Sequence, residues 1–194
     1  MQSSGGLMKK SFIIGKGASL KGFDFEILKD EYTFCLNHAA FVVPHASALC
    51  YCDGNFYKQH PELIDNFKGD IYKSTKVGPG EYIVPLYGVG SLSGLFALYV
   101  ALQKSERVYL LGYDLNTTEE YPYFSNDFPG RGQEEFEKRD GTMKLFYNEG
   151  TFNSDRIARF EEIFSDQKHR VFNCNPDSAI KTFPFVDIKE VLSE

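Results

Sequence analysis

Residues 11–22 read SFIIGKGASLKG, and this stretch decides the fold. The uninterrupted apolar run at 12–14 predicts a short buried strand. The glycines that follow it, Gly15 and Gly17, predict a tight turn in which the backbone lies open to a ligand. A helix expected directly after this turn would present free N–H groups to an anion. Strand, glycine turn and helix start together predict a phosphate-binding site.

Two polar side chains in the turn suit the same purpose. Lys16 adds a positive charge, and Ser19 can cap the helix or donate to the phosphate. The third glycine of the dinucleotide-binding fingerprint is absent, because Leu20 stands in its place, and the Walker pattern is absent too. A tight turn that needs glycine and binds no ligand is therefore the alternative.

The composition is that of a globular protein with one domain. The chain has 194 residues, of which 42% are hydrophobic and 25% charged, so it can bury a sizeable core. Its formal net charge of −6 argues against extensive nucleic-acid contact. No apolar run approaches the ~20 residues that a bilayer-spanning helix needs. We interpret residues 1–7 as an added leader ahead of a native start at Met8, and 8–194 as the domain.

The four cysteines predict a reduced protein and not a metal centre. Cys35, Cys50 and Cys52 lie in β-like apolar runs, and Cys174 ends another such run. Free cysteines are among the most often buried residues, so buried thiols are expected here. No pair of CxxC motifs supports a zinc site. We therefore expect no bound metal and a cytoplasmic location.

Strand and helix patterns alternate along the chain. The helical pattern is clearest at 92–104, which has almost no polar face and is typical of a buried central helix. The expected strands lie at 12–14, 32–36, 48–52, 70–74, 82–84, 107–111 and 170–174. Further helices are expected at 55–67, divided by Pro61, and at 153–164. This alternation predicts an α/β domain with a mostly parallel sheet flanked by helices.

Polar residues follow several of the expected strands. Asn37 and His38 follow the second strand, Asp53 the third, and Asp114 the strand at 107–111. The carboxyl ends of parallel strands share one edge, where open α/β sheets bind ligands. Asn37 stands where an NAD-binding unit has an acidic residue, which favours a mononucleotide over NAD. For Asp53, a turn or capping role is the alternative.

Two further segments are candidates for ligand contact. Ser93 and Gly94 open the longest apolar helix after a second glycine-serine turn, so its N-terminus is another candidate anion site. Residues 115–151 are polar, aromatic and glycine-rich, which predicts a lid-like insertion. Tyr121 and Tyr123 in this insertion can donate to a ligand. A plain surface excursion is the alternative.

Taken in order, these motifs resemble the Campylobacter-type bacterial sialyltransferases, glycosyltransferase family 42. They are also similar to a broader group of phage and bacterial proteins with a GxGxSL Rossmann-like core. The similarity covers residues 9–183, and the family's Gly-Asn-Gly-Pro-Ser-Leu motif corresponds to GKGASL here. The matching segments are 15–20, Asn37, Asp53, 92–94, 112–114 and 175–178. The resemblance implies a Rossmann-like fold.

The resemblance also implies a metal-independent transferase that takes a CMP-sugar as donor and a glycan as acceptor, without another cofactor. The family's two tyrosines that steady the leaving phosphate correspond to Tyr121 and, for the second, to a displaced Tyr123. The residues implied in nucleotide binding are Gly15, Lys16, Gly17, Ser19, Asn37, Asp53, Ser93, Gly94 and Asp114.

The catalytic histidine of the family is not matched. Thr151 stands in its place, and a threonine hydroxyl is not a base near neutral pH. Of the four histidines, His38 is the candidate nearest the site and His45 the next, whereas His60 and His169 are expected at the surface. The other candidate bases are Asp53, Asp114 and Glu149.

Several functions therefore stay open. The sequence is compatible with an active glycosyltransferase, with a catalytically inactive nucleotide-binding protein, and with a nucleotide enzyme similar to the pterin pyrophosphokinases. The last would use ATP with magnesium held by Asp53 and Asp114. A phage transferase acting on DNA or a surface glycan is a further alternative, and the net charge of −6 disfavours DNA. The donor sugar, the acceptor and the formation of a homo-oligomer stay open as well.

Overall fold

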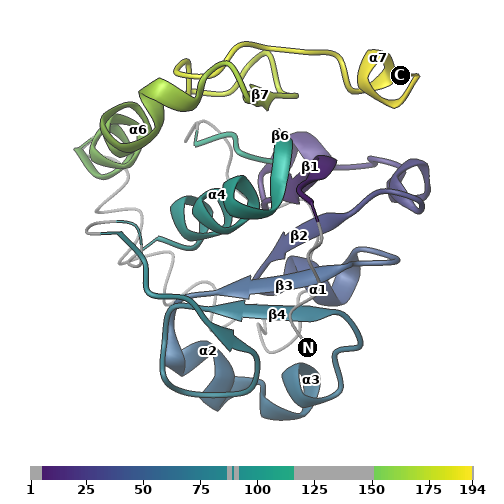
Figure 1. The fold of residues 1–194 in the computed structure, drawn as a ribbon, viewed down its shortest axis with the longest axis vertical. Coiled ribbons are helices and arrows are strands. Elements are labelled where there is room, and N and C mark those ends of the chain that lie inside the picture. Colours follow the sequence, from purple (N-terminus) through teal and green to yellow (C-terminus); the bar gives the residue numbers. More distant parts are fainter. Residues whose placement is uncertain (1–5, 87–88, 90–91, 116–150, 194) are drawn as a thin grey trace.

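A computed structural model describes residues 6–86, 89, 92–115 and 151–193, and these form a seven-stranded sheet (Figure 1). The strand order is β5-β4-β3-β2-β1-β6-β7, and every neighbouring pair is parallel. The strands are β1 (Met8–Ile14), β2 (Thr33–Leu36), β3 (Ala48–Tyr51), β4 (Asp70–Lys73), β5 (Glu81–Tyr82), β6 (Ser105–Leu111) and β7 (Val171–Asn173). The expected α/β fold with a Rossmann-like parallel sheet is confirmed.

The central strand β1 is buried on both faces. Phe12, Ile13 and Ile14 expose no surface. Successive side chains of a strand point to opposite faces. Ile13 accordingly packs in one hydrophobic cluster, and Phe12 and Ile14 pack in the other. Burial on both faces explains why the sequence of this strand is an apolar run without alternation.

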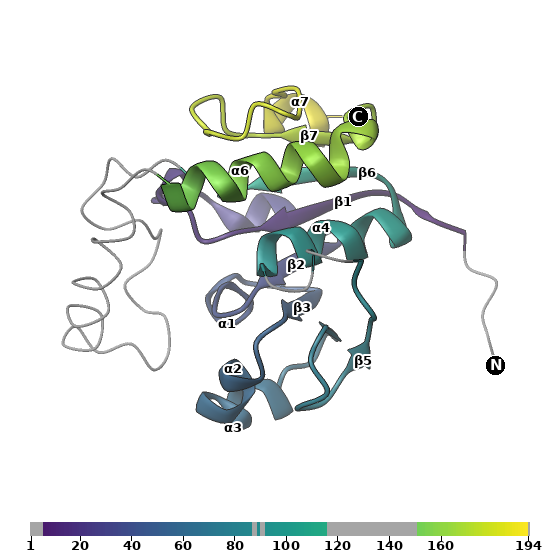
Figure 2. The ribbon, with the colours of Figure 1, turned by 90° about the vertical axis from the view of Figure 1, so that its left-hand side faces the viewer.

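Helices cover both faces of the sheet (Figures 1 and 2). One face packs against α4 (Ser93–Lys104) and α6 (Thr151–Phe164), whose Phe160 and Phe164 are buried there. The shorter helices pack in the cluster of the other face; they are α1 (Ala39–Val42), α2 (Gly54–Gln59), α3 (Pro61–Asp65) and α7 (Ile188–Leu192). The middle of α4 is buried through Leu95, Phe96, Ala97, Leu98, Val100 and Ala101, so the expectation of a central helix at 92–104 is confirmed.

The segment after β1 differs from the expectation. No α-helix follows the glycine turn; two short 3₁₀ helices, η1 (Ala18–Leu20) and η2 (Phe25–Leu28), take its place. Gly22 separates them with φ of +74°, a left-handed conformation that ends a helical run. Asp24 then caps η2 by accepting a hydrogen bond from the Glu26 N–H. The prediction of an α-helix here is therefore wrong, because the chain changes direction at Gly22 before a second helical turn can form.

Other boundaries follow the expectation more closely. Pro61 is the first residue of α3, so the predicted division of the helix at 55–67 is confirmed. The four-residue α1 was not expected. The expected lid-like insertion at 115–151 lies, apart from its two end residues, outside the described residues, as do residues 1–5 of the expected leader. In the described part of the chain, no helix is long and apolar enough to cross a bilayer.

Candidate functional site

The candidate site lies at the carboxyl edge of the sheet, beside β1, where the order in which the chain adds strands reverses. The chain leaves β1 toward β2, β3 and β4 on one side, then returns through α4 to β6 on the other side. Open α/β sheets bind their ligands in the crevice at such a reversal of strand order. The turn at 15–19, Asn37, Asp53, the start of α4 and Asp114 all follow or meet strand ends at this edge.

The glycine turn is shaped by the close approach of β1 and β6. The Gly15 N–H donates to the Leu111 carbonyl at 2.7 Å, and the Gly17 N–H donates to the Gly112 carbonyl at 3.0 Å. A Cβ atom on Gly15 would lie 2.4 Å from the Gly112 oxygen. A Cβ atom on Gly17 would lie 2.4 Å from the carboxyl carbon of Asp114. Close packing against the segment after β6 therefore explains why both positions are glycine. This agrees with the alternative interpretation, in which the tight turn needs glycine and binds no ligand.

Asp114 occupies the donors that the sequence assigned to a phosphate. Its Oδ2 accepts from the Ser19 N–H at 2.8 Å, and its Oδ1 accepts from the Ser19 hydroxyl at 2.5 Å. The Asn175 side-chain amide donates to the same Oδ1 at 2.8 Å. Only 6% of Asp114 is exposed, and these donors offset the cost of burying its carboxylate. The Ser19 donors thus bind an anion that belongs to the chain itself.

Asn175 is a site residue that the sequence interpretation did not select. Asn175 is a polar residue that follows the carboxyl end of β7, as Asn37 follows β2. The same signal that selected Asn37 could therefore have selected Asn175 as a site residue. Its Oδ1 accepts from the Asp177 N–H at 3.0 Å, which fixes the amide with its nitrogen toward Asp114. The side chain therefore positions Asp114 from the strand on the far side of β6.

A second polar cluster joins the ends of β2 and β3 to the start of α4. Asn37 has φ of +48°, a left-handed conformation that asparagine tolerates, and its Nδ2 donates to the Ser93 hydroxyl at 3.1 Å. The Cys52 sulfur lies 3.3 Å from the same hydroxyl. The Asn37 Oδ1 is buried and has no hydrogen-bond partner among the described residues. An unsatisfied buried acceptor costs about 1–3 kcal/mol, so a ligand donor that reached this oxygen would recover that cost.

The start of α4 supplies main-chain donors beside this cluster. The N-cap residue is Leu92, whose apolar side chain makes no capping hydrogen bond. The first N–H groups of a helix have no intrahelical partner, and they carry the positive end of the helix dipole. Gly94 keeps the first turn close to β6, because its carbonyl accepts from the Tyr113 hydroxyl at 3.0 Å. A Cβ atom on Gly94 would lie 3.3 Å from the Tyr113 ring.

The other predicted binding residues have different outcomes. Asp53 is exposed and caps α2 by accepting from the Asn55 N–H at 2.8 Å, so the capping alternative for this residue is confirmed. Lys16 is partly exposed in the glycine turn. Tyr121, Tyr123 and Glu149 lie outside the described residues, and their roles stay predictions.

His38 is buried in the core. Only 4% of it is exposed, and its Nε2 lies 3.0 Å from the Nε2 of His60. Both rings pack edge to face against Phe56. A general base has to reach the acceptor hydroxyl, so this burial favours a structural role for His38. The expectation that His60 lies at the surface is wrong, because only 9% of it is exposed.

The two remaining histidines are exposed. His45 lies 3.5 Å from Glu26 in the turn that leads into β3, which places it at the amino-terminal edge of the sheet. The expectation that His45 lies next nearest to the site is therefore wrong. His169 is exposed, as expected.

All four cysteines are free, and their thiols are poor nucleophiles. Burial raises the pKa of Cys52, the thiol beside Ser93, above its ordinary value, so the thiol stays protonated near neutral pH. Burial likewise raises the pKa of Cys35 and of Cys174 to about 12. The expectation of reduced thiols is consistent with this geometry.

Within the described ranges, no three His, Cys, Asp or Glu side chains gather in a way that could hold a metal ion. Asp53 and Asp114, the candidate magnesium ligands, face different partners: one caps α2, and the other bonds Ser19 and Asn175. No protein-family profile, curated protein or solved structure matches this chain. The resemblance to the family 42 sialyltransferases thus rests on the sequence motifs.

Proposed function

We propose that this protein binds a nucleotide at the carboxyl edge of its sheet, as a glycosyltransferase-like protein that takes a nucleotide-sugar donor. The observation that carries the proposal is the Asn37–Ser93 pair. It sets a buried acceptor without a described partner beside the start of α4, where the N-cap residue Leu92 has no capping side chain. The reversal of strand order at β1 and β6 supports this location independently.

The phosphate of the nucleotide binds the first turn of α4 in this proposal. Free N–H groups and the helix dipole favour an anion there. The glycine turn is the less favourable position, because the Asp114 carboxylate already accepts from Ser19 and would repel a phosphate. This placement revises the sequence interpretation, in which the turn at 15–19 bound the phosphate directly.

The base of the nucleotide lies against Asn37. Its Oδ1 can only accept a hydrogen bond, so it selects a base edge that carries an amino group. Cytosine has such a group at N4 and adenine at N6, whereas a pyrimidine with a carbonyl at that position presents an acceptor. The expected preference for a cytidine nucleotide over a uridine nucleotide agrees with the CMP-sugar that the resemblance implies.

A second candidate function is nucleotide binding without sugar transfer. The burial of His38 against His60 favours it, as does Thr151 in the place of the family's catalytic histidine. Hydrolysis of a CMP-sugar in the absence of an acceptor separates the two candidates, because a binding protein leaves the donor intact.

A thermal-unfolding panel tests the proposal. The ligands are CMP, UMP, ADP, GDP, CMP-sialic acid, and ATP with magnesium. A ligand at 100 times its Kd stabilises the native state by about 2.7 kcal/mol, and about 1 kcal/mol moves the midpoint by about 2–4 °C in a chain of this size. We expect CMP and CMP-sialic acid to raise the midpoint without metal, and UMP to raise it less.

Two variants, tested with the same ligands, locate the binding site. Asn37→Asp keeps the side-chain shape and tolerates the positive φ, but it sets a carboxylate beside the proposed phosphate, so CMP should no longer stabilise the protein. Gln103→Glu adds the same charge at the exposed far end of α4, about 15 Å away, and should leave the response unchanged. A response to ATP with magnesium alone would contradict the proposal and favour a pyrophosphokinase-like enzyme.

A further inference from the structure

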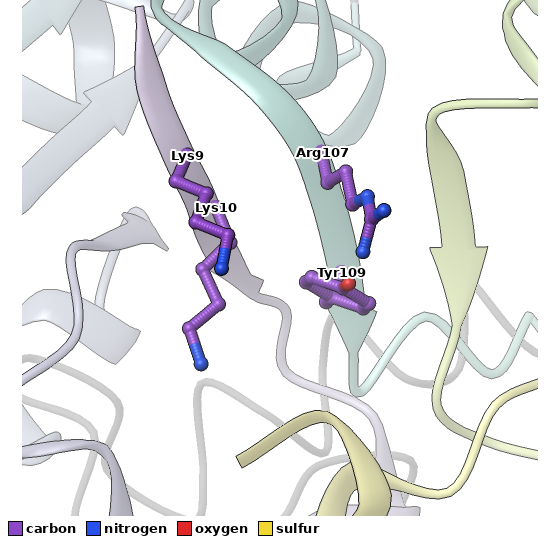
Figure 3. Close-up of a pocket in the computed structure, with 4 residues that line it drawn as sticks. All are labelled: Lys9, Lys10, Arg107 and Tyr109. Carbon is purple, nitrogen blue, oxygen red and sulfur yellow. The ribbon is translucent and has the colours of Figure 1, made fainter. Parts of the chain in front are cut away.

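A basic cavity lies between the amino-terminal halves of β1 and β6. Lys9 and Lys10 from β1 face Arg107 and Tyr109 from β6 across a cavity of about 130 Å³ (Figure 3). These four lining residues carry three positive charges and no negative one. The whole chain has a formal net charge of −6, and the Glu31 carboxylate at 2.8 Å from the Lys10 ammonium offsets one of the three cations of the basic cavity.

Two of the cations are held next to each other by strand pairing. Lys10 and Arg107 are register partners in the parallel β1–β6 pair, so they stand side by side on one face. Like charges at paired positions destabilise a sheet. The Lys10 side chain is only 20% exposed, and the Glu31 carboxylate at 2.8 Å and the Val191 carbonyl at 3.2 Å fix its ammonium group. Strand register therefore holds the positive charges together.

The floor of the basic cavity is rigid. Only 3% of Tyr109 is exposed, and its ring stacks on Phe12 at 5.3 Å and on Phe172 at 5.4 Å between ring centroids. Lys9 and Arg107 at the rim are exposed and can be reached from solvent. A fixed floor and pre-positioned charges lower the entropy cost of binding a ligand.

We propose that the basic cavity binds a phosphate group, either as inorganic phosphate or at the end of a small phosphate monoester. The Arg107 guanidinium matches two phosphate oxygens, and the lysines add point charges. The volume lies below the ~300 Å³ at which pockets for drug-sized ligands begin, so the cavity fits a phosphate group and not a nucleotide.

This phosphate site is separate from the proposed nucleotide site. Lys10 precedes Gly15, which lies at the carboxyl edge of the sheet, by five residues of extended chain, or about 17 Å, so the basic cavity and the proposed nucleotide site lie at opposite edges of the sheet. The inference therefore stands or falls without the proposed function.

The test is an NMR titration of the whole chain with inorganic phosphate, and in a second arm with glycerol 2-phosphate. We expect saturable shifts in the backbone N–H signals of Lys9, Lys10 and Arg107, and small shifts at Ser19 and Ser93. Tighter binding in one arm identifies free phosphate or a phosphate ester as the ligand. Shifts without saturation, or shifts confined to Ser19 and Ser93, would overturn the proposal.

Charge variants complete the test. Lys9→Gln and Arg107→Gln change exposed side chains, so they should fold, and together they should weaken phosphate binding by about tenfold or more. Lys58→Gln removes the same charge from an exposed position on α2 and should leave the affinity unchanged. Equal weakening by the Lys58 variant would show a general charge effect and would refute a built site.

Discussion

The Ser19 main-chain N–H donates to Asp114 Oδ2 at 2.8 Å, and the Ser19 hydroxyl donates to Asp114 Oδ1 at 2.5 Å. These residues lie 95 positions apart in the chain, and their two bonds tie the turn after β1 to the end of β6. The relationship gives the glycine turn a structural purpose that does not depend on a ligand. It also places a negative charge where the sequence predicted a phosphate.

Replacement of the Asp114 carboxylate should destabilise the protein. In Asp114→Asn, the new amide nitrogen cannot accept from Ser19 or Asn175, so at least one buried donor loses its partner at a cost of about 1–3 kcal/mol. Ser19→Ala removes a single side-chain donor and should cost less. Denaturant unfolding measures both values. Asp30→Asn, at an exposed turn, is the control and should change stability by less than ~0.5 kcal/mol. Equal stability of the Asp114 variant and the parent protein would contradict the structural role.

Gly15→Ala should be strongly destabilising, although glycine at this position does not need an unusual φ. The added Cβ would meet the Gly112 oxygen at 2.4 Å, and strand pairing prevents either backbone from moving freely. Forced overpacking of this kind costs about 1–3 kcal/mol. Gly6→Ala is the matched control, because nothing lies within 4 Å of its added Cβ. The two unfolding midpoints check the prediction, and a Gly15 variant as stable as the Gly6 variant would refute the close approach of β1 and β6.

Stability should fall as the pH rises above 9. Burial raises the pKa of Cys35 from 9.0 to about 12, so between these values the unfolded thiol loses its proton while the folded one keeps it. The folded state then binds more protons, and the free energy of unfolding decreases by up to about 1.4 kcal/mol per pH unit for each such thiol. Below pH 9 the contribution is fully present.

Unfolding experiments between pH 9 and 11 measure this slope. Cys35→Ala should give a shallower pH dependence than the parent protein, because one of the groups that resist ionisation is gone. Val108→Ala makes a comparable cavity in the same sheet without a titratable group, and its slope should match that of the parent. An unchanged slope in the cysteine variant would contradict the buried, neutral thiol.

Much of the fold could be predicted because parallel strands buried on both faces have recognisable sequences. The run at 12–14 and the almost wholly apolar α4 both follow from burial, which leaves no polar face in the pattern. The prediction of an α-helix directly after the glycine turn was wrong. Its sequence favours a helical turn, but Gly22 reverses the chain before a second turn forms.

The site was harder to predict because its decisive contacts join distant residues. Strand ends selected Asn37 and Asp114, and the expected start of a helix selected Ser93; the structure places all three at one edge of the sheet. Nothing local shows that Asp114 bonds Ser19, or that Gly15 is required by the Gly112 carbonyl. A glycine turn after a strand arises both from ligand contact and from close packing, and only the long-range partners distinguish the two. The burial of His60 against His38 is equally invisible in sequence.

The most direct measurement of the central claim is an NMR titration with CMP in the absence of metal. We expect saturable shifts of the main-chain N–H signals of Ser93, Gly94 and Leu95 and of the Asn37 side-chain amide, and we expect the main-chain shifts to be lost in Asn37→Asp. Absence of binding at millimolar CMP, or binding that leaves the start of α4 unperturbed, would contradict it.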